Sequence, residues 1–289
     1  VGFAAGVAYI LGNVTAGTAL SLTFAAYLQP LAPCLPPRVV ALGLAAAVLA
    51  VNMGGVQQSR RVNDVLVAFK VVVLVIFVAV GLAAGAAWQA SNLVPLQLGG
   101  LARASGLLFF AFTGFSRPVT IVEEIRDPAR NLPRALLVAL AGSTVLYLAV
   151  ALVALGLIGP GALAASAAPL RAALVPTGQP WAVTLISVGG LVATADVLLT
   201  DIWAVSRMLF AMARRGDLPG VFGRLTPGGV PRVAVLVAGS VIILLTATAS
   251  FAPILAASSL GLLVYYSVMD WAALRLRPGQ RLYPHPVPI

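Results

Sequence analysis

The stretch Leu107 to Arg134, LLFFAFTGFSRPVTIVEEIRDPARNLPR, decides how the rest of the chain is interpreted. It begins as an apolar membrane-spanning pattern, is interrupted at Thr113-Gly114 and Pro118, and continues into a charged loop that starts at Glu123-Glu124. A helix that breaks inside a bilayer leaves backbone N–H and C=O groups without partners, which is tolerated only where they line a cavity or bind a ligand. The stretch therefore predicts the substrate site of a transporter.

Composition places the chain in the membrane-protein class. Of 289 residues, 61% are hydrophobic and 9% are charged, and the mean hydropathy is +1.03. Soluble domains carry about 25% charged residues. The net charge of +10 would suggest nucleic-acid binding in a soluble chain, but here the arginines lie in loops between apolar runs, as membrane topology requires. The pattern favours a polytopic protein of the lipid bilayer and argues against a nucleic-acid partner.

Eight apolar segments are long enough to cross a hydrocarbon core that needs about 20 helical residues. They lie near 2–28, 39–57, 65–87, 105–122, 135–158, 181–206, 233–250 and 253–274. The expected fold class is all-α, a polytopic bundle of transmembrane helices. The chain opens at Val1 inside an apolar run without a Met, so we expect a fragment of a longer protein.

Basic residues predict how the helices are oriented. Thirteen arginines fall in alternate loops, namely Arg60, Arg61, Arg126, Arg130, Arg134, Arg207, Arg214, Arg215, Arg224, Arg232, Arg275, Arg277 and Arg281. The opposite loops carry Arg38, Arg103 and Arg171. By the positive-inside rule the first set is cytoplasmic, so the first helix runs outward and the broken fourth segment runs inward.

Several charges remain inside or at the edge of the spans: Lys70, Arg117, Asp196, Asp201 and Asp270. A charge at a helix centre costs about 2.5–3.5 kcal/mol on insertion scales, so each needs a cavity, a partner or an interface. For Asp270, which lies about one turn before Arg275, the sequence favours an ion pair at the membrane surface.

Lys70 is the single lysine in the chain, which otherwise uses arginine for its basic residues. A desolvated amine can lose its proton, whereas a guanidinium effectively cannot, so a lysine here suits a group that loads and releases a proton. The alternative is that Lys70, about 9 Å along the helix from Asp64, extends to the cytoplasmic interface. Both interpretations stay open at this point.

Asp196 and Asp201 share the sixth apolar segment. Five residues of helix separate them by about 140°, so they cannot form a carboxylate dyad. Their heights along the helix allow two pairings, Lys70 with Asp196 and Arg117 with Asp201. Such pairs can serve function or can simply hold helices together, because intramembrane charges are usually paired whatever their role.

The run 109–135, FFAFTGFSRPVTIVEEIRDPARNLPRA, resembles the sixth helix and following loop of amino-acid permeases of the amino acid–polyamine–organocation superfamily. It shares an apolar-aromatic run, a Gly-Phe break, an acidic pair and the pattern N/D-P-x-R-x-x-P-R. Two further stretches agree in order and spacing. Residues 54–70 resemble the loop into the family's fifth helix, and residues 206–231 resemble the end of its eighth helix and the next loop.

The resemblance covers essentially the whole chain, from the family's third helix to its tenth. It implies a transporter built on a five-plus-five inverted repeat that works by alternating access. Residues 1–104 would hold the last three helices of the first repeat, and residues 105–276 the second repeat. Residues 277–289 would be a cytoplasmic connection to further helices, with the family's first two and last two helices absent.

The resemblance also assigns roles to single residues. The unwound stretch that meets the substrate corresponds to Phe112, Thr113, Gly114, Phe115 and Ser116. Lys70 matches a lysine that replaces a sodium ion in some proton-coupled members, with Asp196 near the same cation position. Asp201 falls near a pocket-lining position. Many relatives have Glu where this chain has Ser116 followed by Arg117, so Arg117 could alter the charge preference or pair with Asp201.

The expected function is secondary active transport of amino acids across the membrane by alternating access, with proton-coupled symport as its leading form. The alternatives are an amino acid or amine exchanger, a polyamine transporter, or a non-transporting membrane homologue. An enzyme is not expected, because the chain has no HExxH or GxSxG motif and its sole histidine, His285, lies in a Pro-rich tail. The sequence also has no GxxxxGK[ST] Walker motif, so a primary pump driven by ATP is not expected.

We expect protons rather than sodium as the coupling ion, with no metal and no organic cofactor. The expected partners are a small amino acid or related amine and the lipid bilayer, and the oligomeric state is left open. The expected location is the plasma membrane, which in a bacterium is the inner membrane.

Overall fold

The structure is a computed structural model that describes residues 2–55, 60–93, 98–114 and 127–275. Its α-helices are α1 (Gly2–Leu28), α2 (Pro37–Met53), α3 (Arg60–Ala83), α4 (Leu101–Leu108), α5 (Pro128–Ala165), α6 (Pro169–Leu174), α7 (Pro180–Arg214), α8 (Arg232–Thr248) and α9 (Phe251–Leu274). Short 3-10 turns are η1 (Gly85–Ala87), η2 (Ala90–Leu93), η3 (Leu98–Gly100), η4 (Phe109–Phe112), η6 (Val175–Thr177) and η7 (Gly220–Gly223). Within these ranges the chain has no strand, which confirms the all-α prediction.

Five helices are long and apolar enough to cross a bilayer: Gly2–Leu28, Arg61–Ala83, Arg130–Ala165, Pro180–Arg214 and Phe251–Leu274. The shorter apolar helices α2 and α8 have 17 residues each, the lower limit for a span. The chain is therefore a multi-pass membrane protein. The fourth expected segment, 105–122, is described only as far as residue 114, where helical structure has already ended.

One expected boundary differs from the structure. The sequence pattern placed residues 127–134 in a charged loop, but α5 begins at Pro128. Proline is tolerated in the first turn of a helix because the N–H that it lacks would have no helical partner there. The arginines of this stretch therefore lie on the first turns of α5.

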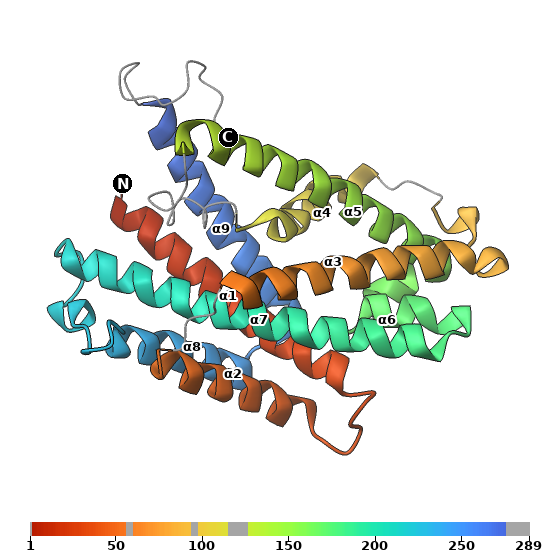
Figure 1. Ribbon diagram of the computed structural model, residues 1–289, viewed down its shortest axis with the longest axis horizontal. Coiled ribbons are helices and arrows are strands. Elements are labelled where there is room, and N and C mark those ends of the chain that lie inside the picture. The colour runs from red at the N-terminus through yellow and green to blue at the C-terminus, as the bar shows by residue number, and fades with distance from the viewer. Residues whose placement is uncertain (1, 56–59, 94–97, 115–126, 276–289) are drawn as a thin grey trace.

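Helix α1 lies at the centre of the bundle, between α7 and α9 (Figure 1). In the most apolar 18-residue stretch of α1, 56% of the residues are buried, against 11% in that of α5. Small residues allow the close approach: a Cβ added to Gly261 of α9 would lie 2.9 Å from the Cα of Gly12. Ser258 Oγ also donates a hydrogen bond to the Gly12 carbonyl at 2.8 Å. The small side chains thus allow α1 and α9 to pack almost backbone to backbone.

Neighbouring helices run antiparallel in the way that the predicted topology requires. The start of α1 meets the end of α7, where Arg215 lies next to Gly2. At the opposite end of the bundle, the guanidinium of Arg38 at the start of α2 donates hydrogen bonds to the carbonyls of Ala247 and Ala249 at the end of α8. The start of α1 and the end of α7 therefore lie on the same side of the bundle, at the left in Figure 1. Which side faces the cytoplasm stays a prediction, as does the division into two repeats.

Helix α5 is kinked near its end, where Gly159 has a φ of 73°. Pro160 has no N–H to donate to the carbonyl of Gly156, four residues earlier. That carbonyl instead accepts hydrogen bonds from the N–H of Gln89 and from Nδ2 of Asn92, both at 2.9 Å. The segment after α3 thus supplies the donors that the proline removes.

Gly156→Ala is expected to lower the free energy of unfolding by about 1–3 kcal/mol, as overpacking of a filled site does. Its Cβ would lie 1.8 Å from Nε1 of Trp88. The matched control is Gly142→Ala in the same helix, where a Cβ has nothing within 4 Å. Thermal unfolding in detergent checks both variants; equal melting temperatures for the two would contradict the prediction.

Candidate functional site

The helix formed by α4 and η4 ends at Thr113 and Gly114. Thr113 has an extended backbone with ψ 156°, and Gly114 has φ 108°, a region that side chains other than glycine rarely adopt. Both the N–H and the Oγ1 hydroxyl of Thr113 donate to the carbonyl of Phe110, at 3.3 and 2.8 Å. The predicted interruption at Thr113-Gly114 is therefore confirmed. Phe115, Ser116 and Arg117 lie outside the described residues.

Tyr266 of α9 binds the backbone at this break. The N–H of Gly114 donates to the Tyr266 hydroxyl at 3.2 Å, and the Tyr266 ring contacts Phe109 edge-on with centroids 5.6 Å apart. Sequence reasoning missed this residue. The available signal was the pair Tyr265-Tyr266, two aromatic residues with polar hydroxyls inside an otherwise apolar helix.

Aromatic rings surround the break on two sides. Phe112 contacts Tyr147 of α5 with centroids 5.4 Å apart, and Tyr265 contacts both Tyr266 at 5.2 Å and Tyr9 of α1 at 5.0 Å. The freed backbone of Thr113 and Gly114 is thus bordered by rings from α5 and α9, and the α9 rings are contacted in turn by a ring of α1. A backbone donor beside aromatic faces is chemically suited to a small organic molecule with an anionic or polar end.

Lys70 of α3 and Asp196 of α7 form a close ion pair. Lys70 Nζ lies 2.6 Å from Asp196 Oδ2, and the two side chains are 24% and 7% exposed. The helices approach closely because Gly189 of α7 faces Val73 of α3, where an added Cβ would lie 2.7 Å from Val73 Cγ1. The predicted pairing is confirmed, and the ammonium group points to α7 rather than along α3 to the membrane surface. A role in proton coupling stays a prediction.

Asp201 is 1% exposed and lies on the face of α7 that also carries Leu198 and Val205. Those two side chains belong to an apolar core that includes residues of α1, α2 and α8. Its proposed partner Arg117 lies outside the described residues, so that pairing and a pocket-lining role for Asp201 stay predictions. Helix α1 packs along both α7 and α9 and so connects the ion pair with the break.

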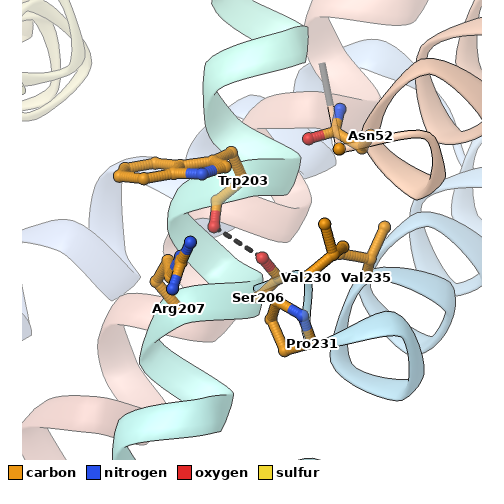
Figure 2. Close-up of a pocket in the computed structure, with 8 residues that line it drawn as sticks. Asn52, Trp203, Ser206, Arg207, Val230, Pro231 and Val235 are labelled. Carbon is orange, nitrogen blue, oxygen red and sulfur yellow. Dashed lines mark hydrogen bonds between the residues drawn. The ribbon is translucent and has the colours of Figure 1, made fainter. Parts of the chain in front are cut away.

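A separate cavity lies between α2, α7 and the start of α8 (Figure 2). It is lined by Asn52, Gly55, Trp203, Ser206, Arg207, Val230, Pro231 and Val235. Ser206 Oγ donates to the Trp203 carbonyl at 2.7 Å. The cavity volume of about 20 Å³ has room for about one water molecule. It is too small for an amino acid and is not the substrate site.

Comparison with known proteins identifies the family of the chain. A family model described as amino acid permease matches residues 1–287. The chain belongs to the amino acid permease family. This confirms the resemblance to the amino acid–polyamine–organocation superfamily and agrees with the expectation of a permease rather than an enzyme.

Individual relatives of this permease chain are also named as transporters or permeases. An uncharacterized transporter of Mycobacterium tuberculosis (strain ATCC 25618 / H37Rv) is 37% identical over 278 residues, which is 95% of this chain and 62% of the relative. A methylthioribose transporter of Bacillus subtilis (strain 168) is 35% identical over 67% of this chain and 41% of its own length. A branched-chain amino acid permease of the same organism is 29% identical over 78% of this chain and 49% of its own length. The permease chain thus spans less than two thirds of the length of these relatives.

Proposed function

We propose that the protein carrying this chain moves amino acids or related amines across the membrane by alternating access, in the inner membrane of a bacterium. The observation that carries the proposal is the break at Thr113-Gly114, where a backbone donor is held by the Tyr266 hydroxyl inside the bundle. A substrate carboxylate could take the place of that hydroxyl, because anions bind well to freed backbone N–H groups at interrupted helices. The aromatic rings of Phe109 and Phe112 would then cover the apolar part of the substrate.

Proton coupling is proposed through Lys70 and Asp196. The ion pair joins α3 to α7 while the amine holds its proton. Loss of that proton would remove one charge and leave the buried carboxylate of Asp196 alone, which is costly in a low-dielectric setting. Protonation would therefore favour the arrangement in which α3 and α7 are joined, and deprotonation would favour a different one. This gives the proton gradient a means to bias the two orientations of the bundle.

The substrate is proposed only as a class. The relatives are named for branched-chain amino acids and for methylthioribose, and another, in Arabidopsis thaliana, for cationic amino acids. The test is uptake by the complete gene product in proteoliposomes, using labelled amino acids, polyamines and methylthioribose, with and without an imposed pH gradient. Accumulation of one class that needs the gradient supports the proposal. Uptake that needs substrate loaded inside indicates an exchanger, and no uptake of any compound indicates a non-transporting homologue.

Tyr266→Phe is expected to lower uptake at least fivefold while the melting temperature stays nearly unchanged. The variant keeps the ring contact with Phe109 but removes the hydroxyl that orders the Gly114 N–H. Tyr147→Phe is the matched control, because the contact of Tyr147 with Phe112 is through the ring. Uptake kinetics of both variants in proteoliposomes provide the check, and equal loss in the two would show that the Tyr266 hydroxyl has no specific role at the break.

A further inference from the structure

A charged side chain lies at the small cavity between α2, α7 and the turn before α8 (Figure 2). Within the described part of the chain, Arg207 Nε is buried and has no hydrogen-bond partner. Arg207 Nη2 donates to the Gly229 carbonyl at 3.5 Å, which is long for a hydrogen bond. The guanidinium also lies 5.4 Å from the centre of the Trp203 ring. A buried N–H group without an acceptor destabilises a fold, so we expect the cavity to supply an acceptor.

The wall of this cavity is formed by residues of the chain itself. Gly55, which follows α2, packs against the turn, because a Cβ added to it would lie 2.6 Å from Val230 Cγ2. Two hydrogen bonds close the turn. The Thr226 N–H donates to the Val230 carbonyl at 3.0 Å, and the Val230 N–H donates to the Thr226 hydroxyl at 3.2 Å. The space that remains is about 20 Å³, which admits one water molecule or one monatomic ion and no organic ligand.

The polar atoms of the lining decide between these two occupants. Asn52 Nδ2 donates to the carbonyls of Val48 at 3.0 Å and Leu199 at 3.3 Å. Both hydrogens of the amide are thus used, and Asn52 offers the cavity its Oδ1 acceptor. Ser206 donates its hydroxyl hydrogen to the Trp203 carbonyl at 2.7 Å and keeps the lone pairs of Oγ. The two uncharged polar side chains of the lining are therefore acceptors toward the cavity.

A water molecule fits this combination of groups better than an anion does. Chloride would be attracted by the Arg207 guanidinium but repelled by the lone pairs of Asn52 and Ser206. Water can accept a hydrogen bond from the guanidinium and donate its own two hydrogens to the two oxygens. This gives it about three hydrogen bonds, the number that buried waters in proteins typically make.

We infer that this cavity binds one water molecule, which accepts a hydrogen bond from the Arg207 guanidinium and donates to Asn52 Oδ1 and Ser206 Oγ. The water joins α2 to α7 beside the direct hydrogen bond from Asn52 to the Leu199 carbonyl. It also holds the Arg207 side chain in the position from which Nη2 reaches the turn before α8. The inference does not depend on transport, because no residue of the break or of the Lys70–Asp196 pair takes part.

X-ray footprinting of the complete gene product in nanodiscs tests the inference. Hydroxyl radicals formed from a bound water oxidise the nearest side chains even where bulk solvent does not reach. Val235 and Ile242 of α8 are 2% and 0% exposed, and Val235 lines the cavity. Val235 is expected to be oxidised about fivefold faster than Ile242, because the bound water lies next to it. Arg207→Met removes the donor and is expected to abolish this difference, whereas Arg214→Met, at an exposed position of the same helix, is expected to retain it.

Two outcomes of this experiment would overturn the inference. Equal oxidation of Val235 and Ile242 in the wild type would show that no water is bound in the cavity. Oxidation of Val235 that appears only when chloride in the buffer is replaced by gluconate would show that a halide occupies the cavity instead.

A variant that fills the cavity provides a second test. Val235→Ile adds one methylene group to the lining and is expected to lower the melting temperature by about 3 °C, since displacing the water leaves the guanidinium of Arg207 without its acceptor. Val237→Ile, at an exposed position of the same helix, is the control and should leave the melting temperature unchanged. A higher melting temperature for Val235→Ile would show that the cavity is dry and would also overturn the inference.

Discussion

Asp196→Ala is expected to lower the free energy of unfolding by about 3 kcal/mol, because the ammonium of Lys70 would lose its carboxylate inside the bundle. The value is at the lower end for a broken buried pair, since the Lys70 side chain is 24% exposed and can gain some solvation. Thermal unfolding of the purified protein in detergent measures the loss. Lys70→Met alone should also be destabilising, because the carboxylate of Asp196 would then be buried without its ammonium partner.

Two further variants make this prediction specific. The double variant Lys70→Met with Asp196→Leu replaces the pair by apolar side chains and is expected to recover most of the stability. Arg215→Gln breaks an exposed pair with Asp217, 3.8 Å long, and should change the melting temperature little. If Asp196→Ala melted like Arg215→Gln, the Lys70–Asp196 pair would contribute nothing to the fold. A double variant that still accumulated substrate with a pH gradient would exclude the proposed coupling role.

Gly114→Val is expected to reduce uptake at least tenfold while the helix content of the protein stays the same. At φ 108° a β-branched side chain collides with its own backbone, so the break would adopt another conformation and its N–H would move away from Tyr266. Space is not the cause, because an added Cβ at this position has nothing within 4 Å. Uptake in proteoliposomes and circular dichroism together provide the measurement.

The control for this variant is Gly106→Ala in α4. Gly106 also has open space around its added Cβ, but its φ is not in the positive range. Alanine is favoured over glycine by about 0.5–1 kcal/mol inside a helix, so this variant should be neutral or slightly stabilising. Comparable uptake by Gly114→Val and by the wild type would show that the conformation of the break is not needed for transport.

Features governed by local chemistry could be predicted from the sequence. The break follows from Thr113 and Gly114 themselves, since a glycine in an apolar span permits a conformation that stops the helix. The pairing of Lys70 with Asp196 follows from the cost of leaving either charge alone in the membrane, together with their matched depths. In both cases a single strong physical penalty leaves few alternatives.

Other features depend on tertiary contacts that no local pattern encodes. The hydrogen bond from Gly114 to Tyr266 joins residues 152 positions apart, and a tyrosine in an apolar helix has many possible partners. The guanidinium of Arg275 lies over the Trp271 ring, whereas the sequence favoured an ion pair with Asp270. Helical spacing alone does not fix the side-chain directions that decide between these two contacts. The start of α5 at Pro128 was missed because a proline-rich charged stretch resembles a loop until the first-turn tolerance for proline is considered.

The kink in α5 has a consequence for the dynamics of the bundle. The amide N–H of Gln89 donates a hydrogen bond to the carbonyl of Gly156 in α5, which is distant in sequence. It can exchange with solvent deuterium only when the end of α5 separates from the segment that follows α3. The exchange rate of this one amide therefore measures how often α5 and the segment after the Lys70 helix part from each other.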